Sequence, residues 1–251
     1  MAPMDSIISI TGLSKSFGRR KALNNINLDI KKGEFVAVFG PNGAGKTTLL
    51  KIMSTIINPS RGSVLVNGID AKKHPEKIRG MIGAISHETY LYDELTAREN
   101  LVFFARMYGI ENNNIDERVD SMLKSVNLLQ RSDERAGSFS RGMKQRLSIA
   151  RALLHQPEIL FMDEPYTGLD QHAAANFERV LMSTGDSDVT RIMITHNIER
   201  AFELCDRMLI MDRGEIRFDK LKTEIESVDE FKEQYLSIVE KDTDAEGISN
   251  V

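Results

Sequence analysis

The stretch that decides the fold is Phe35-Val36-Ala37-Val38-Phe39, followed at once by Gly40-Pro41-Asn42-Gly43-Ala44-Gly45-Lys46-Thr47-Thr48. The first five residues are all apolar, which is typical of a strand covered on both faces of a parallel sheet. Residues 40–47 then fit the pattern G-x-x-x-x-G-K-[ST], and a helical pattern begins at Lys46. Because a buried strand precedes the glycines and a helix follows them, we expect residues 40–48 to bind the phosphates of a nucleotide.

The chemistry of such a loop follows from its residue types. Glycines let backbone N–H groups turn toward an anion without Cβ clashes, and the helix that follows directs its positive end at the same phosphates. Lys46 is then expected to reach the outer phosphates, and Thr47 to place its hydroxyl on Mg²⁺. The alternative is a glycine-rich turn that happens to contain Lys-Thr, and such a turn needs no strand and helix on these two sides.

Outward from this loop, apolar strands alternate with helices. Further apolar runs occur at Met81–Ile85, Ile159–Met162, Ile192–Ile194 and Met208–Met211. Helical patterns lie at about Lys46–Ile57, Gln171–Met182 and Asn197–Leu204. This alternation predicts a doubly wound α/β sheet. Nearer the N-terminus, Ile7–Ile10 and Ile26–Ile30 alternate apolar with polar residues, as the half-buried strands of a small antiparallel sheet do.

The middle of the chain breaks this alternation. From about Thr96 to Gln156 the periodicity is helical, with helices expected at Ala97–Tyr108, Ile115–Leu129 and Arg141–His155. We interpret residues 88–156 as an α-helical subdomain inserted into a domain that spans residues 1–222. Residues 223–251 are expected to form a charged C-terminal extension, with one amphipathic helix at Val228–Val239 and a disordered polar end from Lys241.

Composition narrows the class of protein. With 251 residues, 41% of them hydrophobic, the chain can bury the core of one large domain with a smaller inserted subdomain. The formal charge of −4 gives no basic excess, which argues against nucleic acid as a partner. The single cysteine, Cys205, is expected to be a buried thiol in a reducing cytosol. Neither a secretory signal nor an apolar run of ~18 residues is found, so a role at a membrane would require a partner.

Two acids follow the apolar run Ile159–Met162. Because ligands bind at the carboxyl ends of strands in open α/β sheets, Asp163 is placed to hold Mg²⁺ through water. The adjacent Glu164 points the other way and could accept a proton from an attacking water. A pair of acids after a strand is often only a solvated turn, but combined with the phosphate loop it predicts nucleotide hydrolysis.

Several motifs now agree, and the chain resembles the nucleotide-binding subunit of ABC transporters up to about Asp219. Phe17, in a Lys-Ser-Phe-Gly segment, matches the family's aromatic residue that stacks on adenine; the alternative is a core phenylalanine. The other matches are the family signature at Ser140-Arg141-Gly142-Met143, the loop that crosses to a second subunit at Gly168-Leu169-Asp170, and the γ-phosphate-sensing histidine at His196.

The resemblance implies a P-loop NTPase (RecA-like) parallel-sheet core with an N-terminal antiparallel β subdomain and the inserted helical subdomain. It also implies ATP and Mg²⁺ as ligands, and ATP hydrolysis coupled to transport. Ser140 and Gly142 begin a helix, where a hydroxyl and backbone N–H groups make a second anion site. In the family this site holds the γ-phosphate bound to a second chain. A head-to-tail dimer beneath separate transmembrane subunits, on the inner face of the cell membrane, is therefore implied.

Two departures from the family pattern stand out. His87 occupies the place of a glutamine that touches Mg²⁺, and the charge of a histidine there depends on pH. Arg141 and Met143 replace a glycine and a glutamine, and Arg141 adds a cation close to the expected γ-phosphate. With these features the chain is similar to ABC-2 type and haem exporter cassettes. The apolar residues Leu101, Phe103, Phe104, Met107 and Tyr108 either line a groove for a coupling helix of the membrane subunit or pack the helical subdomain.

Two other functions stay open. A soluble ABC protein that acts on ribosomes or DNA usually has two cassettes or long insertions, which this sequence does not contain. An ATP-gated binding module with weak hydrolysis is suggested by His87 and Arg141, and Glu164 argues against it. Some residues are assigned no site: Arg19-Arg20-Lys21 is interpreted as a solvated turn, and His74, His155 and His172 have no metal partner at ligand spacing.

Overall fold

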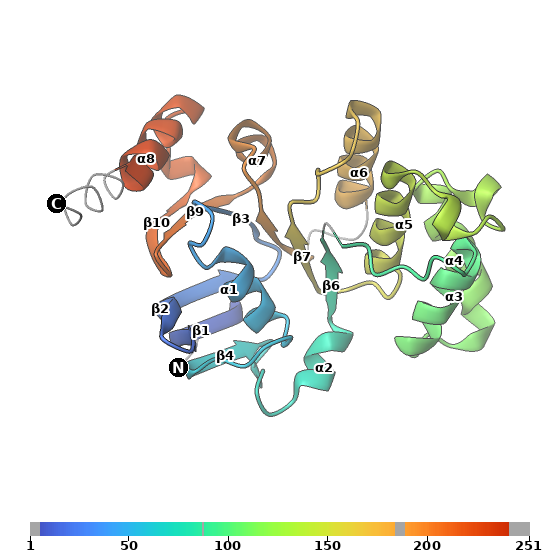
Figure 1. The fold of residues 1–251 in the computed structure, drawn as a ribbon, viewed down its shortest axis with the longest axis horizontal. Helices are drawn as coiled ribbons and strands as arrows, with labels where there is room; N and C mark the ends of the chain where they lie inside the picture. The colour runs from blue at the N-terminus through green and yellow to red at the C-terminus, as the bar shows by residue number, and fades with distance from the viewer. Residues whose placement is uncertain (1–5, 87, 184–188, 241–251) are drawn as a thin grey trace. The chain divides into compact units, whose positions relative to one another are not determined.

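The computed structural model of the chain describes residues 6–86, 88–183 and 189–240. It divides into two compact units. Unit 1 consists of Met1–Arg79 and Thr190–Val251, and unit 2 of Gly80–Val189. Figure 1 shows the course of the chain through both, from blue at the N-terminus to red at the C-terminus.

Unit 1 contains a four-stranded antiparallel sheet in the order β2 (Arg20–Lys31), β1 (Ser6–Phe17), β4 (Arg61–Val66) and β5 (Ile69–Asp70). Alternate residues of β2, such as Ile26, Leu28 and Ile30, are buried, so the predicted flanking sheet is confirmed. The two predicted strands were too short. Register shifts in the β1–β2 pairing allow the hairpin to continue to the pair Phe17–Arg20.

A second group of strands in unit 1 has the order β10 (Glu215–Leu221), β9 (Arg207–Asp212), β3 (Phe35–Phe39) and β8 (Thr190–Ile194). β3 runs parallel to both β8 and β9, while β10 returns antiparallel along β9. Every residue of β3 and β8 is buried, which confirms the strands predicted from the apolar runs Phe35–Phe39 and Ile192–Ile194, although β8 begins two residues earlier, at Thr190.

Among the residues that the structure describes, four α-helices begin in unit 1: α1 (Lys46–Met53), α2 (Pro75–Gly80), α7 (Ile198–Leu204) and α8 (Val228–Glu240). α1 ends earlier than the predicted Ile57 because Thr55 has a positive φ of 61°, which a helix cannot continue. α8 confirms the predicted amphipathic helix, and its Lys232 pairs with Glu199 of α7 at 2.7 Å. The polar end predicted to be disordered lies outside the described residues.

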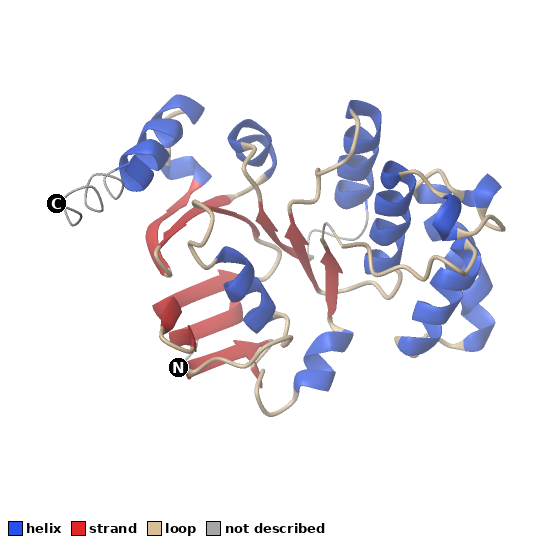
Figure 2. Cartoon of the chain, in the orientation of Figure 1, coloured by secondary structure: helices blue, strands red, loops and turns tan. Residues whose placement is uncertain are grey.

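Unit 2 pairs two parallel strands, β6 (Ile82–Ile85) and β7 (Ile159–Asp163). Between them come α3 (Ala97–Met107), α4 (Asn112–Ser125) and α5 (Arg141–Leu153), which pack on one another as Figure 2 shows, and α6 (Gln171–Ser183) follows β7. The three helices predicted between the two strands are present, and an inserted subdomain at residues 88–156 stays a prediction. The helix expected at Ile115–Leu129 is wrong at its end, because Asn127 turns the chain with a φ of 57° and a short 3₁₀ turn follows.

Candidate functional site

The phosphate loop of unit 1 needs glycine at two positions for steric reasons. Gly40 has a φ of 143°, and a Cβ there would lie 2.0 Å from the carbonyl oxygen of Met211. Gly45 has a φ of 103°, and its Cβ would lie 2.5 Å from the carbonyl oxygen of Ala22. The loop is therefore wrapped closely against β9 and β2, and its curvature depends on backbone that has no side chain.

The loop lines one cavity of about 410 Å³. Lys46 is buried beneath it, and its Nζ donates to the carbonyl oxygens of Gly40 at 2.6 Å and Pro41 at 3.0 Å. Phe17, at the end of β1, lines the same cavity and is 52% exposed. Phe17 is thus not a core phenylalanine, and its ring is accessible to a ligand. The cavity also takes in residues 42–45, Thr47 and Thr48, and so includes most of the predicted phosphate-binding loop.

Arg20 is a residue of this cavity that the sequence interpretation missed. Arg19-Arg20-Lys21 was expected to be a solvated turn, but Arg20 and Lys21 belong to β2. A Cβ on Gly43 would lie 3.0 Å from Nη2 of Arg20, so the guanidinium stands beside the phosphate loop. Together with Lys46 it makes the cavity cationic, as an anion site requires. Only the crossing of β2 past the loop brings Arg20 there.

In unit 2, the two predicted acids stand where β7 ends. Asp163 is the last residue of β7 and is half-buried, and Glu164 follows with a φ of 51°. A positive φ is unusual for glutamate and marks a backbone held by its surroundings. Successive turns follow, from Thr167 N–H to Glu164 O at 3.1 Å and from Leu169 N–H to Tyr166 O at 3.1 Å.

The signature residues and the Gly168-Leu169-Asp170 loop share one hollow of unit 2. The hydroxyl of Ser140 accepts from the N–H of Met143 at 3.3 Å and so caps α5. Asp170 caps α6 in the same way, accepting from the N–H of Ala173 at 2.7 Å. Ser140, Gly142 and Asp170 together line a cavity of about 230 Å³. Two helix N-termini therefore open onto one space, which favours an anion there.

Arg141 connects these two motifs directly. A Cβ on Gly168 would lie 2.7 Å from its Nε and 3.0 Å from its Cδ, so the arginine side chain lies against the Gly168 backbone. Further along α5, the buried Gln145 reaches the carbonyl oxygen of Pro165 at 3.4 Å. The first turns of α5 therefore support the segment that follows Glu164.

Of the two predicted site histidines, His196 and His87, the structure describes only His196. His196 follows β8 in unit 1 and is exposed. Its neighbours fix the turn: the N–H of Asn197 donates to Thr195 Oγ1 at 3.1 Å, and Asn197 caps α7. His87 lies outside the described residues. Cys205 is buried as expected, and desolvation raises the pKa of its thiol.

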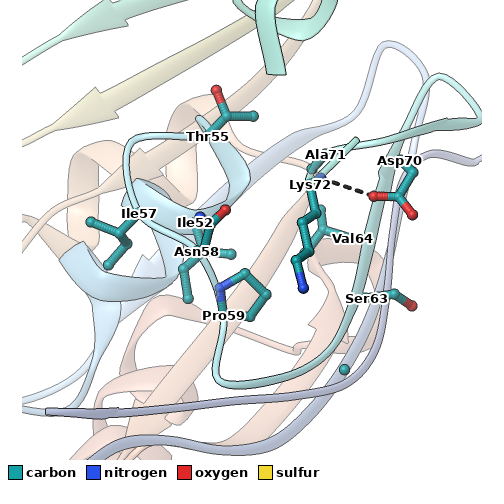
Figure 3. A pocket seen from close by; sticks show the side chains of 11 residues that line it. Ile52, Thr55, Ile57, Asn58, Pro59, Ser63, Val64, Asp70, Ala71 and Lys72 are labelled. Atoms are coloured by element: carbon teal, nitrogen blue, oxygen red, sulfur yellow. Dashed lines mark hydrogen bonds between the residues drawn. The ribbon is translucent and has the colours of Figure 1, made fainter. Parts of the chain in front are cut away.

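A further hollow of unit 1 is too small to be a ligand site. It lies beside the end of α1 and the β4–β5 hairpin, measures about 60 Å³, and is drawn in Figure 3. That volume has room for a few water molecules but not for a nucleotide. Its one carboxylate, Asp70, already accepts from the backbone N–H of Lys72 at 2.9 Å, the dashed line of Figure 3.

The described residues contain no helix of the length and apolar character that crossing a membrane requires. They also contain no cluster of three or more histidine, cysteine, aspartate or glutamate side chains that could hold a metal ion.

The chain has a phosphate loop that requires glycine and lies between a buried strand and a helix, and it has acids at the end of another buried strand. These features define a nucleotide-binding protein of the phosphate-loop class. Residues 23–167 match the family described as ABC transporter. The chain is 37% identical to the ABC transporter ATP-binding protein NatA of Bacillus subtilis, over 84% of this chain and 87% of NatA. It is 38% identical to the Nod factor export ATP-binding protein I of a Rhizobium species, over 82% of this chain and 68% of that protein.

Comparison with a solved structure supports the same family through the fold. A dimeric ATP-binding cassette in a post-hydrolysis state, bound to ADP and Pi, superimposes with a TM-score of 0.78 at 28% identity, covering 86% of this chain and 98% of the cassette. The chain belongs to the ABC transporter family. It has the ABC cassette fold and is an ATP-binding, ATP-hydrolysing subunit of that family.

Proposed function

We propose that the chain works as a dimer that binds two Mg·ATP at composite sites and drives export through separate transmembrane subunits. The observation that carries this proposal is the division of the site residues. Unit 1 offers a cationic phosphate loop, and unit 2 offers a second anion site where Ser140, Gly142 and Asp170 line one hollow. Two such sites on one chain suit a head-to-tail pair, in which each loop is completed by the partner's signature. The dimeric relative bound to ADP and Pi supports the same arrangement.

The residues present fit Mg²⁺. Magnesium is usually held by one or two carboxylates together with nucleotide phosphates and water, and not by an all-protein cage. Asp163 ends a buried strand and is itself half-buried, and Thr47 is an exposed residue at the start of α1, next to the phosphate loop. We assign these two residues to the metal. When bound, Mg²⁺ would neutralise charge on the phosphates.

The remaining roles follow from charge and position. Lys46, buried under the loop with its ammonium on loop carbonyls, is assigned to the outer phosphates. Glu164 is assigned as the base that accepts a proton from the attacking water, and its positive φ supports a backbone held for that purpose. His196 is assigned to sense the γ-phosphate. His87 keeps its expected role beside the metal as a prediction.

A membrane partner is supported by an exposed aromatic patch in unit 2. Tyr90, Tyr92, Phe103 and Met107 are all large apolar side chains on the surface, and Tyr92 packs edge-on against Phe103 at 4.9 Å. Leu101 and Phe104, in contrast, are buried and pack the helical subdomain. We assign the patch to the coupling segment of a transmembrane subunit, on the inner face of the membrane. Export is favoured because the Rhizobium relative is described as an export protein.

The catalytic proposal is tested by two substitutions in the purified chain. Glu164→Gln should keep ATP binding, trap an ATP-dependent dimer on size exclusion, and lower phosphate release by on the order of a hundredfold or more. Lys46→Ala should lose ATP binding and the dimer together. Phosphate release that is unchanged in Glu164→Gln would remove Glu164 from the role of base.

The transport proposal needs a different experiment. The chain, tagged and expressed with the genes next to its own, should co-purify from detergent-solubilised membranes with a multispanning protein. Met107→Glu places a charge in the aromatic patch and should abolish that co-purification, whereas Glu111→Lys, at the N-cap of α4 and outside the patch, should not. If no membrane protein is recovered, a soluble ABC function becomes the better explanation.

A further inference from the structure

Arg151, near the C-terminal end of α5, is a buried cation. It is 8% exposed, and none of the ion pairs formed by residues of unit 2 that the structure describes includes it. Its Nη2 donates to the carbonyl oxygen of Ala84 at 2.9 Å, and its Nε has no hydrogen-bond partner in the described part of the chain. Burial lowers the pKa of Arg151, as expected for a charge taken out of water.

The guanidinium connects three segments. Ala84, whose carbonyl it binds, lies in β6. The ring of Tyr90, beyond the end of that strand, has its centroid 5.8 Å from the guanidinium carbon. The ring of Phe104, on α3, lies 5.2 Å from it. One side chain of α5 therefore contacts both ends of the stretch 84–90, and these contacts have the geometry of cation–π pairs.

His155 strengthens the same connection. Its Nε2 lies 3.0 Å from the carbonyl oxygen of Ile82, and its ring stacks on Tyr108 with centroids 3.7 Å apart. Ile82 and Ala84 are two residues apart, so their carbonyls point to the same edge of β6. Among the described strands of unit 2, β6 pairs with β7 alone. Arg151 and His155, which follow the signature along the chain, thus occupy the other edge of β6.

A purely structural role does not explain the choice of arginine. A leucine or methionine of similar volume would fill the site without the cost of burying a charge. The contacts of a guanidinium are directional, because a carbonyl must lie in its plane and an aromatic ring over its face. Its contacts therefore fix how β6 and Tyr90 lie relative to α5, which hydrophobic packing would leave freer.

We propose that Arg151 is a positioning residue that fixes Ala84 of β6 and Tyr90 to the signature helix α5, and that ATP turnover depends on this connection. The proposal rests on the function proposed above, in which α5 carries the signature at Ser140 and Tyr90 belongs to the surface that meets the membrane subunit.

Arg118 offers a matched control. It lies on α4, and its guanidinium also binds carbonyl oxygens near the end of α5, those of Leu154 at 2.8 Å and Leu153 at 3.2 Å. Burial lowers its pKa too. In the ranges of the chain that the structure describes, its hydrogen bonds are to Leu153 and Leu154 and not to Ala84 or Tyr90. Arg151→Met and Arg118→Met therefore each remove an arginine that donates to a backbone carbonyl oxygen, but only the first loses the contacts with Ala84 and Tyr90.

The first measurement is steady-state ATPase kinetics of the full chain, with each variant assayed at the same interval below its own Tm. Arg151→Met should lower kcat by on the order of tenfold while KM for ATP stays within about twofold. Arg118→Met should leave both within about twofold. Arg151→Lys, which keeps the charge but not the planar contacts, should fall between wild type and Arg151→Met.

The second measurement is amide hydrogen exchange of residues 84–90, which does not depend on hydrolysis. Exchange should be at least tenfold faster in Arg151→Met than in wild type, and unchanged in Arg118→Met. If wild type fails to hydrolyse ATP, the proposed function fails, and the exchange result still decides the role of Arg151. Tyr90→Leu should raise the exchange rate similarly. The double variant Arg151→Met/Tyr90→Leu should exchange no faster than either single variant.

Two results would overturn the proposal. One is equal behaviour of Arg151→Met and Arg118→Met in both kcat and exchange. The other is multiplicative effects of Arg151→Met and Tyr90→Leu, because independent sites add in free energy. Should Arg151→Met not fold, Arg151→Lys and Tyr90→Leu provide the same comparison.

Discussion

The ring of Phe231, on α8, packs edge-on against the ring of Phe39, with centroids 5.1 Å apart and planes at 61°. Phe39 is the last residue of β3 and directly precedes Gly40 of the phosphate loop. Phe231 is fully buried and also meets Phe218 of β10 at 5.6 Å. The C-terminal helix therefore packs on the strand that leads into the phosphate loop.

Phe231→Ala should destabilise the chain by about 3–5 kcal/mol, because it removes a fully buried aromatic ring and leaves a cavity. Leu236→Ala, on the same helix at a half-exposed position, should change stability by less than about 0.5 kcal/mol. Urea unfolding followed by circular dichroism measures both. A chain that ends at Lys222 should lose at least as much stability as Phe231→Ala. Equal midpoints for the two alanine variants would mean that α8 contributes nothing through Phe231.

Gly40→Ala should impair the phosphate loop far more than glycine replacement elsewhere. Its φ of 143° is unfavourable for alanine, and its Cβ would also meet the Met211 carbonyl oxygen at 2.0 Å. Gly68 has a φ of 74° with no atom within 4 Å of its Cβ position. Gly68→Ala therefore measures only the cost in stability of a positive φ at alanine, about 1 kcal/mol. Binding of a fluorescent ATP analogue should weaken at least tenfold in Gly40→Ala and remain unchanged in Gly68→Ala. Similar affinities in both variants would contradict a close approach of the loop to β9.

Arg20→Ala should raise the Kd for ATP about two- to fivefold, the effect of removing one exposed cation near phosphates. Arg19→Ala is the control, because Arg19 lies in the β1–β2 turn and does not line the cavity. The difference between the two variants should shrink at high salt, since exposed charges are screened. Isothermal titration at two ionic strengths tests this. An equal loss of affinity in both variants would point to net charge and not to the place of Arg20.

Most of the fold could be predicted because buried parallel strands and amphipathic helices have distinct apolar periods. β3 and β8 consist of residues that are all buried, and they were located within two residues. β10 was missed because its sequence, Glu215–Leu221, is charged at alternate positions and only half-buried. β4 was missed because it begins with Arg61-Gly62-Ser63 and buries only Val64 and Val66. Such half-exposed strands, β10 at a sheet edge and β4 between β1 and β5, are fixed by their neighbours more than by their own composition.

The candidate site could be predicted only where its residues follow one another along the chain. The phosphate loop and the Asp163-Glu164 pair are local patterns tied to one strand end each. Arg20 and Arg151 are different, because each meets its partners, near Gly43 and at Ala84, through the packing of distant elements. Periodicity cannot show which carbonyl a long side chain will reach. Contacts of this kind need the tertiary structure.

The last prediction concerns the pH dependence of stability. The pKa of His155 is lowered to about 4, first by burial and then by the charges of Arg151 and Arg118, against the opposing hydrogen bond to Ile82. In the unfolded chain the pKa is near 6.5, so between pH 6.5 and pH 4 the unfolded state binds the extra proton. The stability that His155 contributes is therefore full above pH 6.5 and falls as the pH drops. From pH 7.5 to pH 5 the loss should be about 2 kcal/mol.

Urea unfolding of wild type and His155→Gln at the two pH values measures the part of this stability loss that comes from His155. Glutamine can still donate to the Ile82 carbonyl, but it does not titrate, so the pH-dependent difference between the two proteins should be that of His155 alone. If His155→Gln loses as much stability on acidification as wild type does, the imidazole is not held neutral, and other groups cause the acid sensitivity.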